Sequence, residues 1–311
     1  MAKEPSGMLI PAYWYPQSPQ PGQPARWDVL SDVGRTMMLG GLIVVANHDG
    51  GHFTEVDSNY ANSIAALRKI CTPVLGYVHD CYNGTKTDGN CINYLAANVM
   101  GDVDRWFNTY NVDGIFIDQV GSREVDEPRA ESLVQQVRNR RSDAIVVLNP
   151  GSIPSQTFMT RTDPAIVVIR EAPIDDYGAF PPAGDKYAWL RNRADGVYAG
   201  IAARRLAIIA HTAPNQAHVD SLIAKAEQYQ IRWVHVQHAL DPDTGVAIMG
   251  PIYEPFSVHL LDIAERLSLC ARMGCAIPFG RLFCRLANYL LCYILQTRNM
   301  LLGVVRRLRR R

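Results

Sequence analysis

The sequence predicts a (β/α)8 barrel of the TIM type with a short basic extension at its C-terminal end. Short apolar runs recur along most of the chain and are rich in β-branched residues, without regular polar alternation. Such runs are typical of parallel strands that are buried on both faces. Helical patterns or long connections separate the runs, so that strand and helix alternate through about 260 residues, the usual size of this barrel.

An open doubly wound sheet is the competing fold. That fold usually carries a glycine-rich phosphate loop after its first strand, and the segment YWYPQSPQPGQP is not such a loop. The sequence therefore favours the barrel.

Eight segments are predicted strands. In chain order they are 8–15, 41–47, 73–79, 114–119, 144–150, 165–171, 205–211 and 232–238. Helix start signals stand between them: Asp57 or Ser58 as a cap, Glu127-Pro128 as a first turn, and Asn215 as a cap. A last helix is expected over 255–267. We expect the barrel to span residues 1–268.

Residues 269–311 differ from the rest of the chain. Ten arginines and no acidic residue follow Glu265, so residues 1–265 carry a net charge of about −9 although the whole chain carries +1. We expect this extension, helical or disordered, to have no folded role, with binding to a membrane surface as the alternative. The overall charge indicates no general affinity for nucleic acid, and we expect a monomer.

The N-terminal segment shows no secretory signal pattern, and no stretch is long and apolar enough for a transmembrane helix. A cytoplasmic location is the default expectation. Cys81 and Cys91 bracket a polar loop and are compatible with a disulfide or with free thiols. Free thiols are favoured because no export signal is visible.

Polar and aromatic residues stand where the predicted strands end. In a barrel these ends meet at the C-terminal face, where active sites of this fold lie. The candidate site residues are Tyr15, Asn47, Tyr77, His79, Asp118, Gln119, Asn149, Glu171, His211 and Gln237.

Asp118 and Glu171 end the fourth and sixth strands, which places both carboxyl groups in one cleft. Hydrolysis of a glycosidic bond needs two carboxyl groups, one to protonate the departing oxygen and one to attack the sugar or activate water. Burial at a strand end can hold one of them protonated near neutral pH. From position alone, structural ion pairing of each residue remains an equal alternative.

The chain also resembles the spherulin-4 family (spherulation-specific family 4). The resemblance rests on the order and spacing of MLIPAYWYP, VVANHDGG, VLGYVHDCY, VDGIFIDQ, VVLNPG and IVVIREAP, and it extends through GPIYEPFSVHLLDIAERL. It implies a barrel of glycoside-hydrolase type that acts inside α-1,4-linked polysaccharides containing galactosamine or N-acetylgalactosamine. It also implies an extracellular location and matches Asp118 and Glu171 to the acidic site residues of the family.

Gln119 departs from the family pattern, in which the residue after the first site aspartate is often Glu. An amide cannot act as a general acid or base. The departure raises the alternative of a non-catalytic carbohydrate-binding or cell-surface protein. If two carboxyl groups suffice, Gln119 is expected to hydrogen-bond a sugar hydroxyl. The expected roles are then Glu171 as general acid/base and Asp118 as nucleophile or stabiliser of the transition state.

The remaining candidates concern binding. Tyrosine suits sugars because its ring stacks on their apolar faces, so Tyr15 and Tyr77 are expected to contact substrate, whereas Tyr13 is expected in the barrel interior. Asn149 fits a site residue and a turn equally well. No HxH on the first strand and no HExxH occurs, so no metal and no cofactor are expected.

Overall fold

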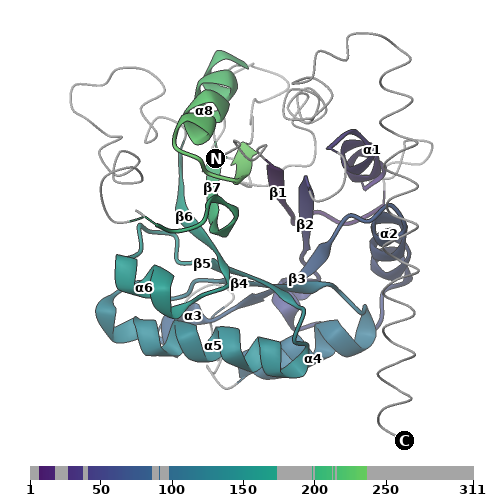
Figure 1. Cartoon of the computed structure of the whole chain (residues 1–311). Coiled ribbons are helices and arrows are strands. Elements are labelled where there is room, and N and C mark those ends of the chain that lie inside the picture. The colour runs from purple at the N-terminus through teal and green to yellow at the C-terminus, as the bar shows by residue number, and fades with distance from the viewer. Residues whose placement is uncertain are drawn as a thin grey trace, which may run out of the picture.

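The computed structural model describes residues 7–17, 27–37, 41–85, 91, 98–173, 198, 200–211, 213 and 216–236. Within these residues, parallel strands β1 to β8 form a closed barrel in chain order. β1 pairs with β8 through Gly7 opposite Trp233 and so closes the sheet. Helices cover the outside of the barrel (Figure 1). The predicted (β/α)8 fold is confirmed.

All eight predicted strands are present, with ends that differ from the prediction by a few residues. They are β1 (Gly7–Ala12), β2 (Leu42–Ala46), β3 (Val74–His79), β4 (Gly114–Asp118), β5 (Ile145–Asn149), β6 (Ile166–Pro173), β7 (Leu206–His211) and β8 (Trp233–Val236).

The α-helices follow the strands on the outside. They are α1 (Asp28–Met37), α2 (Ser58–Lys69), α3 (Cys81–Gly84), α4 (Val99–Thr109), α5 (Glu127–Arg140), α6 (Gln156–Arg161) and α8 (Gln216–Gln228). Short 3-10 turns are η1 (Asp49–Gly51), η4 (Glu124–Asp126) and η6 (Ala203–Arg205).

Two of the predicted helix starts are confirmed. The side chain of Asp57 accepts a hydrogen bond from the backbone of Asn59 and caps α2. α5 begins at Glu127 with a proline in its first turn. Asn215, the predicted cap of α8, lies outside the described residues, as do Gln237, the helix predicted over 255–267 and the extension 269–311.

The core has two layers, which follow from the alternation of side chains along each strand. Leu75, Tyr77 and Phe116 belong to a buried cluster inside the barrel. Val78, Ile115 and Ile117 belong to the larger cluster between the strands and the helices. Because residues at the strand ends continue this alternation, the inner set leads directly to the barrel mouth.

A glycine on β3 lets α4 pack closely against the barrel. A β-carbon at Gly76 would lie 2.3 Å from Cγ of Trp106, the central aromatic residue of α4. The indole nitrogen of Trp106 donates a 2.8 Å hydrogen bond to the backbone oxygen of Tyr77. Helix α4 is thereby fixed to the strand that carries Tyr77 and His79. None of the helices in the described residues has the length and apolar character needed to cross a membrane.

Candidate active site

Asp118 reaches the barrel mouth by regular strand alternation. Phe116, two residues earlier on β4, fills the barrel interior, so Asp118 points to the same side one step nearer the mouth. In the sheet register Asp118 stands between His79 on β3 and Asn149 on β5. The three strand ends therefore form one continuous edge of the mouth.

Glu171 reaches the mouth through an irregularity in β6. Val168 pairs with Ala207, and the register then shifts so that Glu171 pairs with Ile209. Val168, Ala207 and Ile209 all belong to the interior cluster. Strict alternation from Val168 would turn the side chain of Glu171 outward, and the extra residue turns it inward. Bulges commonly re-aim a side chain next to an active site in this way.

Asn149 joins the two carboxyl groups. Its side-chain nitrogen Nδ2 donates to Oδ1 of Asp118 at 2.8 Å and to Oε2 of Glu171 at 2.5 Å. Its own oxygen Oδ1 accepts a 3.2 Å hydrogen bond from the backbone of Gly151, which fixes the orientation of the amide. The two carboxylate oxygens contact one nitrogen, so they lie at most about 5.3 Å apart, the sum of the two distances.

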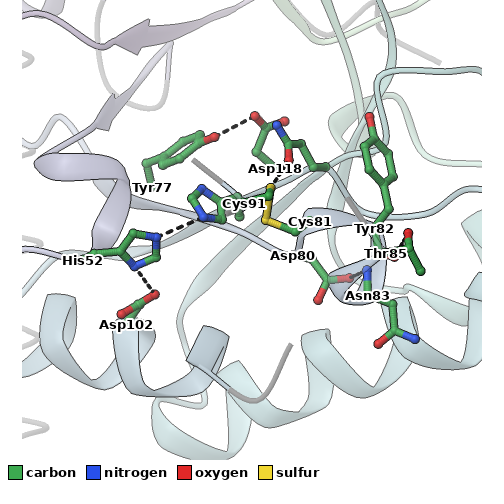
Figure 2. The surroundings of a disulfide bond; sticks show 12 residues. His52, Tyr77, Asp80, Cys81, Tyr82, Asn83, Thr85, Cys91, Asp102 and Asp118 are labelled. Carbon is green, nitrogen blue, oxygen red and sulfur yellow. Dashed lines mark hydrogen bonds and ion pairs between the residues drawn. A yellow bond between two sulfur atoms is a disulfide. The ribbon is translucent and has the colours of Figure 1, made fainter. Parts of the chain in front are cut away.

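Tyr77 contacts Asp118 from the interior of the barrel. Its hydroxyl donates a 2.8 Å hydrogen bond to Oδ2 of Asp118, as Figure 2 shows. The residue is 5% exposed, and its ring packs in the barrel interior against Tyr13 and Phe116. The expected role of Tyr77 as a surface for a sugar ring does not fit this burial. The structure links Tyr77 to the site through Asp118, and Tyr13 packs against the interior cluster as predicted.

The surroundings of Asp118 favour its protonated form up to near neutral pH. Burial and the neighbouring charge of Glu171 raise the pKa of Asp118 to about 7, against the opposing effect of the hydrogen bonds from Tyr77 and Asn149. Burial and the charge of Asp118 also raise the pKa of Tyr77, so its hydroxyl stays protonated and can donate. Two carboxyl groups whose protonation differs are the arrangement that acid–base chemistry needs.

The favoured state of Cys81 and Cys91, free thiols, is wrong in this structure. The two residues form a disulfide that joins the end of β3 to the loop that follows it (Figure 2). Both are buried and their Cα atoms are 5.8 Å apart. Disulfide formation depends on this distance between the two residues, and a signal read from the chain terminus carries no information on it.

Gln119 faces this disulfide. Its side-chain oxygen lies 3.0 Å from Sγ of Cys91. A disulfide sulfur has no proton to donate, so we interpret this contact with the amide turned to place Nε2 against the sulfur, a choice that heavy-atom positions leave open. The backbone of Gln119 has a positive φ of 54°, and its carbonyl accepts a hydrogen bond from Tyr82. This residue therefore packs against the loop after β3.

His79 is 1% exposed and belongs to a histidine–carboxylate chain. Its Nε2 lies 3.0 Å from Nε2 of His52, whose Nδ1 contacts Asp102 at 2.8 Å. His79 also lies close enough to the sulfurs of Cys81 and Cys91 for the three to surround one metal ion. In a disulfide, however, neither sulfur is the thiolate that ligates metals. His79 thus links the end of β3 to His52 beside the barrel mouth.

Three other candidates, Tyr15, Asn47 and His211, follow or end strands β1, β2 and β7. Tyr15 is 44% exposed, and its hydroxyl donates to Asp57 at 3.0 Å. The side chain of Asn47 accepts from the backbone of Gly50 and stabilises the turn after β2. His211 ends β7 and pairs in register with Pro173. Gln237 lies outside the described residues.

Tyr82 is a site residue to which the sequence assigned no role. Its backbone nitrogen donates to the carbonyl of Gln119, the residue after Asp118, and its hydroxyl lies beside Gly151, two residues after Asn149. Burial raises the pKa of Tyr82, and the charges of Asp118 and Glu171 raise it further. The position of Tyr82 just after a strand end is a signal for the site, but the direction of its ring depends on the backbone turn at Cys81–Gly84.

Comparison with known proteins gives a family and a fold. Residues 7–265 match spherulation-specific family 4. Sph3 of Aspergillus clavatus, solved in complex with GalNAc, is similar with a TM-score of 0.57 and 20% identity, over 84% of this chain and 98% of that one. Active domain 2 of a Pyrococcus furiosus chitinase, complexed with chito-oligosaccharides, has a TM-score of 0.51 and 11% identity, over 88% and 97%.

A third similar structure is the cyclic α-maltosyl-(1→6)-maltose hydrolase of Arthrobacter globiformis, with a TM-score of 0.51 and 11% identity, over 89% of this chain and 83% of that one. At these identities the structures support the barrel fold. No curated protein matches the chain. The family match spans most of the sequence and agrees with the motifs and the barrel, and the chain belongs to spherulation-specific family 4.

Proposed function

We propose that the protein is a glycoside hydrolase that uses Asp118 and Glu171 to cleave a polysaccharide. The observation that carries the proposal is the amide of Asn149, which holds both carboxyl groups against one nitrogen at the C-terminal mouth of the barrel. This is the face where enzymes of this fold act. The family match and the sugar-bound proteins of similar fold support the same reaction class.

The geometry supports retention of the anomeric configuration. Retaining glycosidases hold their two carboxyl groups about 5–5.5 Å apart, whereas inverting enzymes need about 6.5–9.5 Å to admit a water molecule. Oδ1 of Asp118 and Oε2 of Glu171 are at most about 5.3 Å apart, which is closer than the inverting range. We therefore infer that one carboxylate attacks the sugar directly and water hydrolyses the product of that attack.

Two assignments of the roles differ in where the proton starts. The assignment expected from the sequence has Glu171 as general acid/base and Asp118 as nucleophile or stabiliser of the transition state, and the other assignment exchanges the two residues. The raised pKa of Asp118 supports a resting state in which Asp118 holds a proton near neutral pH. In the first assignment, Glu171 must hold a proton before it can protonate the departing oxygen.

Aryl glycosides distinguish the two assignments. An aryl group with a low pKa leaves without protonation, so a variant that lacks the acid keeps its first step and one that lacks the nucleophile loses it. If Glu171 is the acid, Glu171→Gln releases a nitrophenol in a burst and Asp118→Asn does not. The reverse pattern would exchange the two roles.

The finer proposal concerns the substrate. We propose an α-1,4-linked polysaccharide that contains galactosamine or N-acetylgalactosamine, cut at internal bonds, in a compartment that permits the Cys81–Cys91 disulfide, such as the extracellular space. The test is release of reducing ends from galactosaminogalactan, native and deacetylated, by wild type beside Asp118→Asn. Release by both proteins would rule out the pair, and binding without release by wild type would favour the carbohydrate-binding alternative.

A further inference from the structure

Tyr82 stands on a strained turn beside the carboxyl pair. Cys81, Tyr82 and Asn83 have φ values of 50°, 51° and 61° in succession. Each costs a residue other than glycine roughly 1–2 kcal/mol relative to ordinary backbone conformations. Such conformations persist where the surroundings enforce them, and they cluster at active sites and ligand-binding sites.

Several contacts enforce this turn. The disulfide ties its first residue to Cys91, and the backbone nitrogen of Tyr82 donates a 2.7 Å hydrogen bond to the carbonyl of Gln119. Asp80, fully buried, accepts from the backbone of Asn83 at 3.0 Å. Two further hydrogen bonds from Arg129, at 3.1 and 2.8 Å, hold the same carboxylate. The backbone that carries the Tyr82 ring is therefore held in place before any ligand arrives.

The ring borders an open pocket. In Figure 2 the Tyr82 ring points upward, as does the carboxyl group of Asp118, with the disulfide below them. The pocket beside it has a volume of about 510 Å³, within the usual range for small-ligand sites. A β-carbon at Gly151 would be 3.9 Å from the Tyr82 hydroxyl, an ordinary van der Waals distance, so the phenol and Gly151 lie side by side in the lining of the pocket. In the described part of the chain, that hydroxyl makes no hydrogen bond.

The pocket offers the chemistry that a sugar needs and adds no net charge. Ser122 and Ser152 place their hydroxyl oxygens 2.6 Å apart on its wall. Arg123 also lines the pocket and is paired with Asp126 at 2.9 Å, so the two charges cancel. An aromatic face with hydroxyls and a neutral ion pair can recognise a pyranose by its apolar face and its hydroxyl groups.

We propose that Tyr82 and the Ser122–Ser152 pocket form a sugar-binding subsite next to the carboxyl pair, in which a pyranose ring stacks on Tyr82. This inference rests on the proposed function and adds a binding residue and a pocket to it. Because the subsite carries no net charge, it contributes equally to binding of acetylated and deacetylated sugars.

The experiment measures binding without turnover. Dissociation constants of galactosaminogalactan oligosaccharides, acetylated and deacetylated, are measured by calorimetry on Glu171→Gln and on double variants in that background. We expect Tyr82→Ala to weaken binding of both ligands at least about tenfold and Tyr82→Phe, which keeps the ring, to change it by less than about threefold. Ser152→Leu fills the pocket without altering the turn and should also weaken binding about tenfold.

Tyr229→Ala is the control, because Tyr229 lies between α8 and β8 at the opposite end of the barrel. Binding by Tyr82→Ala and Ser152→Leu as tight as that of the parent would overturn the subsite. So would a loss in Tyr82→Phe as large as in Tyr82→Ala, because the hydroxyl rather than the ring would then bind. If Glu171→Gln itself binds neither oligosaccharide, the proposed substrate fails, and the subsite fails with it.

Discussion

Replacing Asp118 with asparagine should stabilise the protein at alkaline pH. In the wild type, burial and the charge of Glu171 raise the pKa of Asp118 from 3.8 to about 7. A carboxyl group with a raised pKa contributes its full stability below its unfolded pKa, and that contribution is lost as the pH rises through the folded value. The loss therefore falls between about pH 4 and pH 7.

The rise in the pKa of Asp118 sets the size of the expected change in the free energy of unfolding. About three pKa units at about 1.4 kcal/mol each correspond to a loss of up to about 4 kcal/mol in the free energy of unfolding. Asparagine has no charge to lose, its oxygen can still accept from Asn149, and the Tyr77 hydroxyl can accept from its amide. We expect the variant to be within about 1 kcal/mol of wild type at pH 4 and more stable by up to about 4 kcal/mol at pH 8.5.

Urea unfolding followed by circular dichroism measures this difference from pH 4 to pH 9. Taking the difference between variant and wild type at each pH removes the contribution of groups that both proteins share. Glu171→Gln is the matched variant: it removes one cause of the raised pKa, so the wild-type loss above pH 4 should shrink without vanishing. A difference between Asp118→Asn and wild type that stays constant from pH 4 to pH 8.5 would refute the electrostatic reasoning.

Three other predictions follow from single contacts. Asn149→Ala removes a charge-assisted hydrogen-bond donor from each carboxyl group, so kcat/KM should fall by about 10–100-fold or more. Circular dichroism should show that the variant is folded. Unchanged kinetics would contradict the bridging role of Asn149. Cys91→Ser opens the Cys81–Cys91 disulfide and should cost about 2–3 kcal/mol in urea unfolding, whereas an unaltered midpoint would mean that the bond does not form. Gly76→Ala should destabilise the protein by several kcal/mol because the added β-carbon clashes with Trp106. Gly101→Ala is the control: its β-carbon would have no atom within 4 Å, so this variant should stabilise helix α4 by about 0.5–1 kcal/mol. Equal melting temperatures of the two variants would refute the packing argument.

The sequence was sufficient to predict the barrel because strands that are buried on both faces are continuous apolar runs, which can be recognised in the sequence. Every predicted strand is present, and the position of Asp118 follows from the alternation that puts Phe116 inside. The N-terminal cap of α2 at Asp57 and the start of α5 at Glu127 also depend on local chemistry alone, and both were predicted. Local patterns are reliable where one residue's environment is set by its neighbours in the chain.

The approach of Glu171 to Asp118 depends on geometry that no local pattern shows. By strict alternation from Val168 the side chain of Arg170 would face inward, and only the irregularity in β6 brings Glu171 inward instead. The register of a bulge is set by the partner strand, here β7, so a single-strand pattern cannot reveal it. Strand-end position was thus the right signal for Glu171, although period-two alternation would have excluded it.

The loop after β3 was the least predictable part of the site. Three successive left-handed residues bring Cys81 to Cys91 and turn Tyr82 toward the mouth, and none of the three is glycine. The hydrogen bonds that enforce the turn come from Gln119 and Arg129, which are distant in sequence. The same tertiary contacts explain why the thiols were misjudged and why Tyr82 was left without a role.

If Asp118 and Glu171 act on one glycosidic bond as nucleophile and acid/base, the first product must keep the configuration of the bond that was cut. The most direct measurement is proton NMR of an α-1,4-galactosaminogalactan oligosaccharide during the first minutes of hydrolysis by wild type, with Glu171→Gln as control. We predict that the α-anomer of the new reducing end appears first and that the control yields no product. Initial formation of the β-anomer would contradict the retaining mechanism, and equal release by Glu171→Gln would contradict the role of the carboxyl pair.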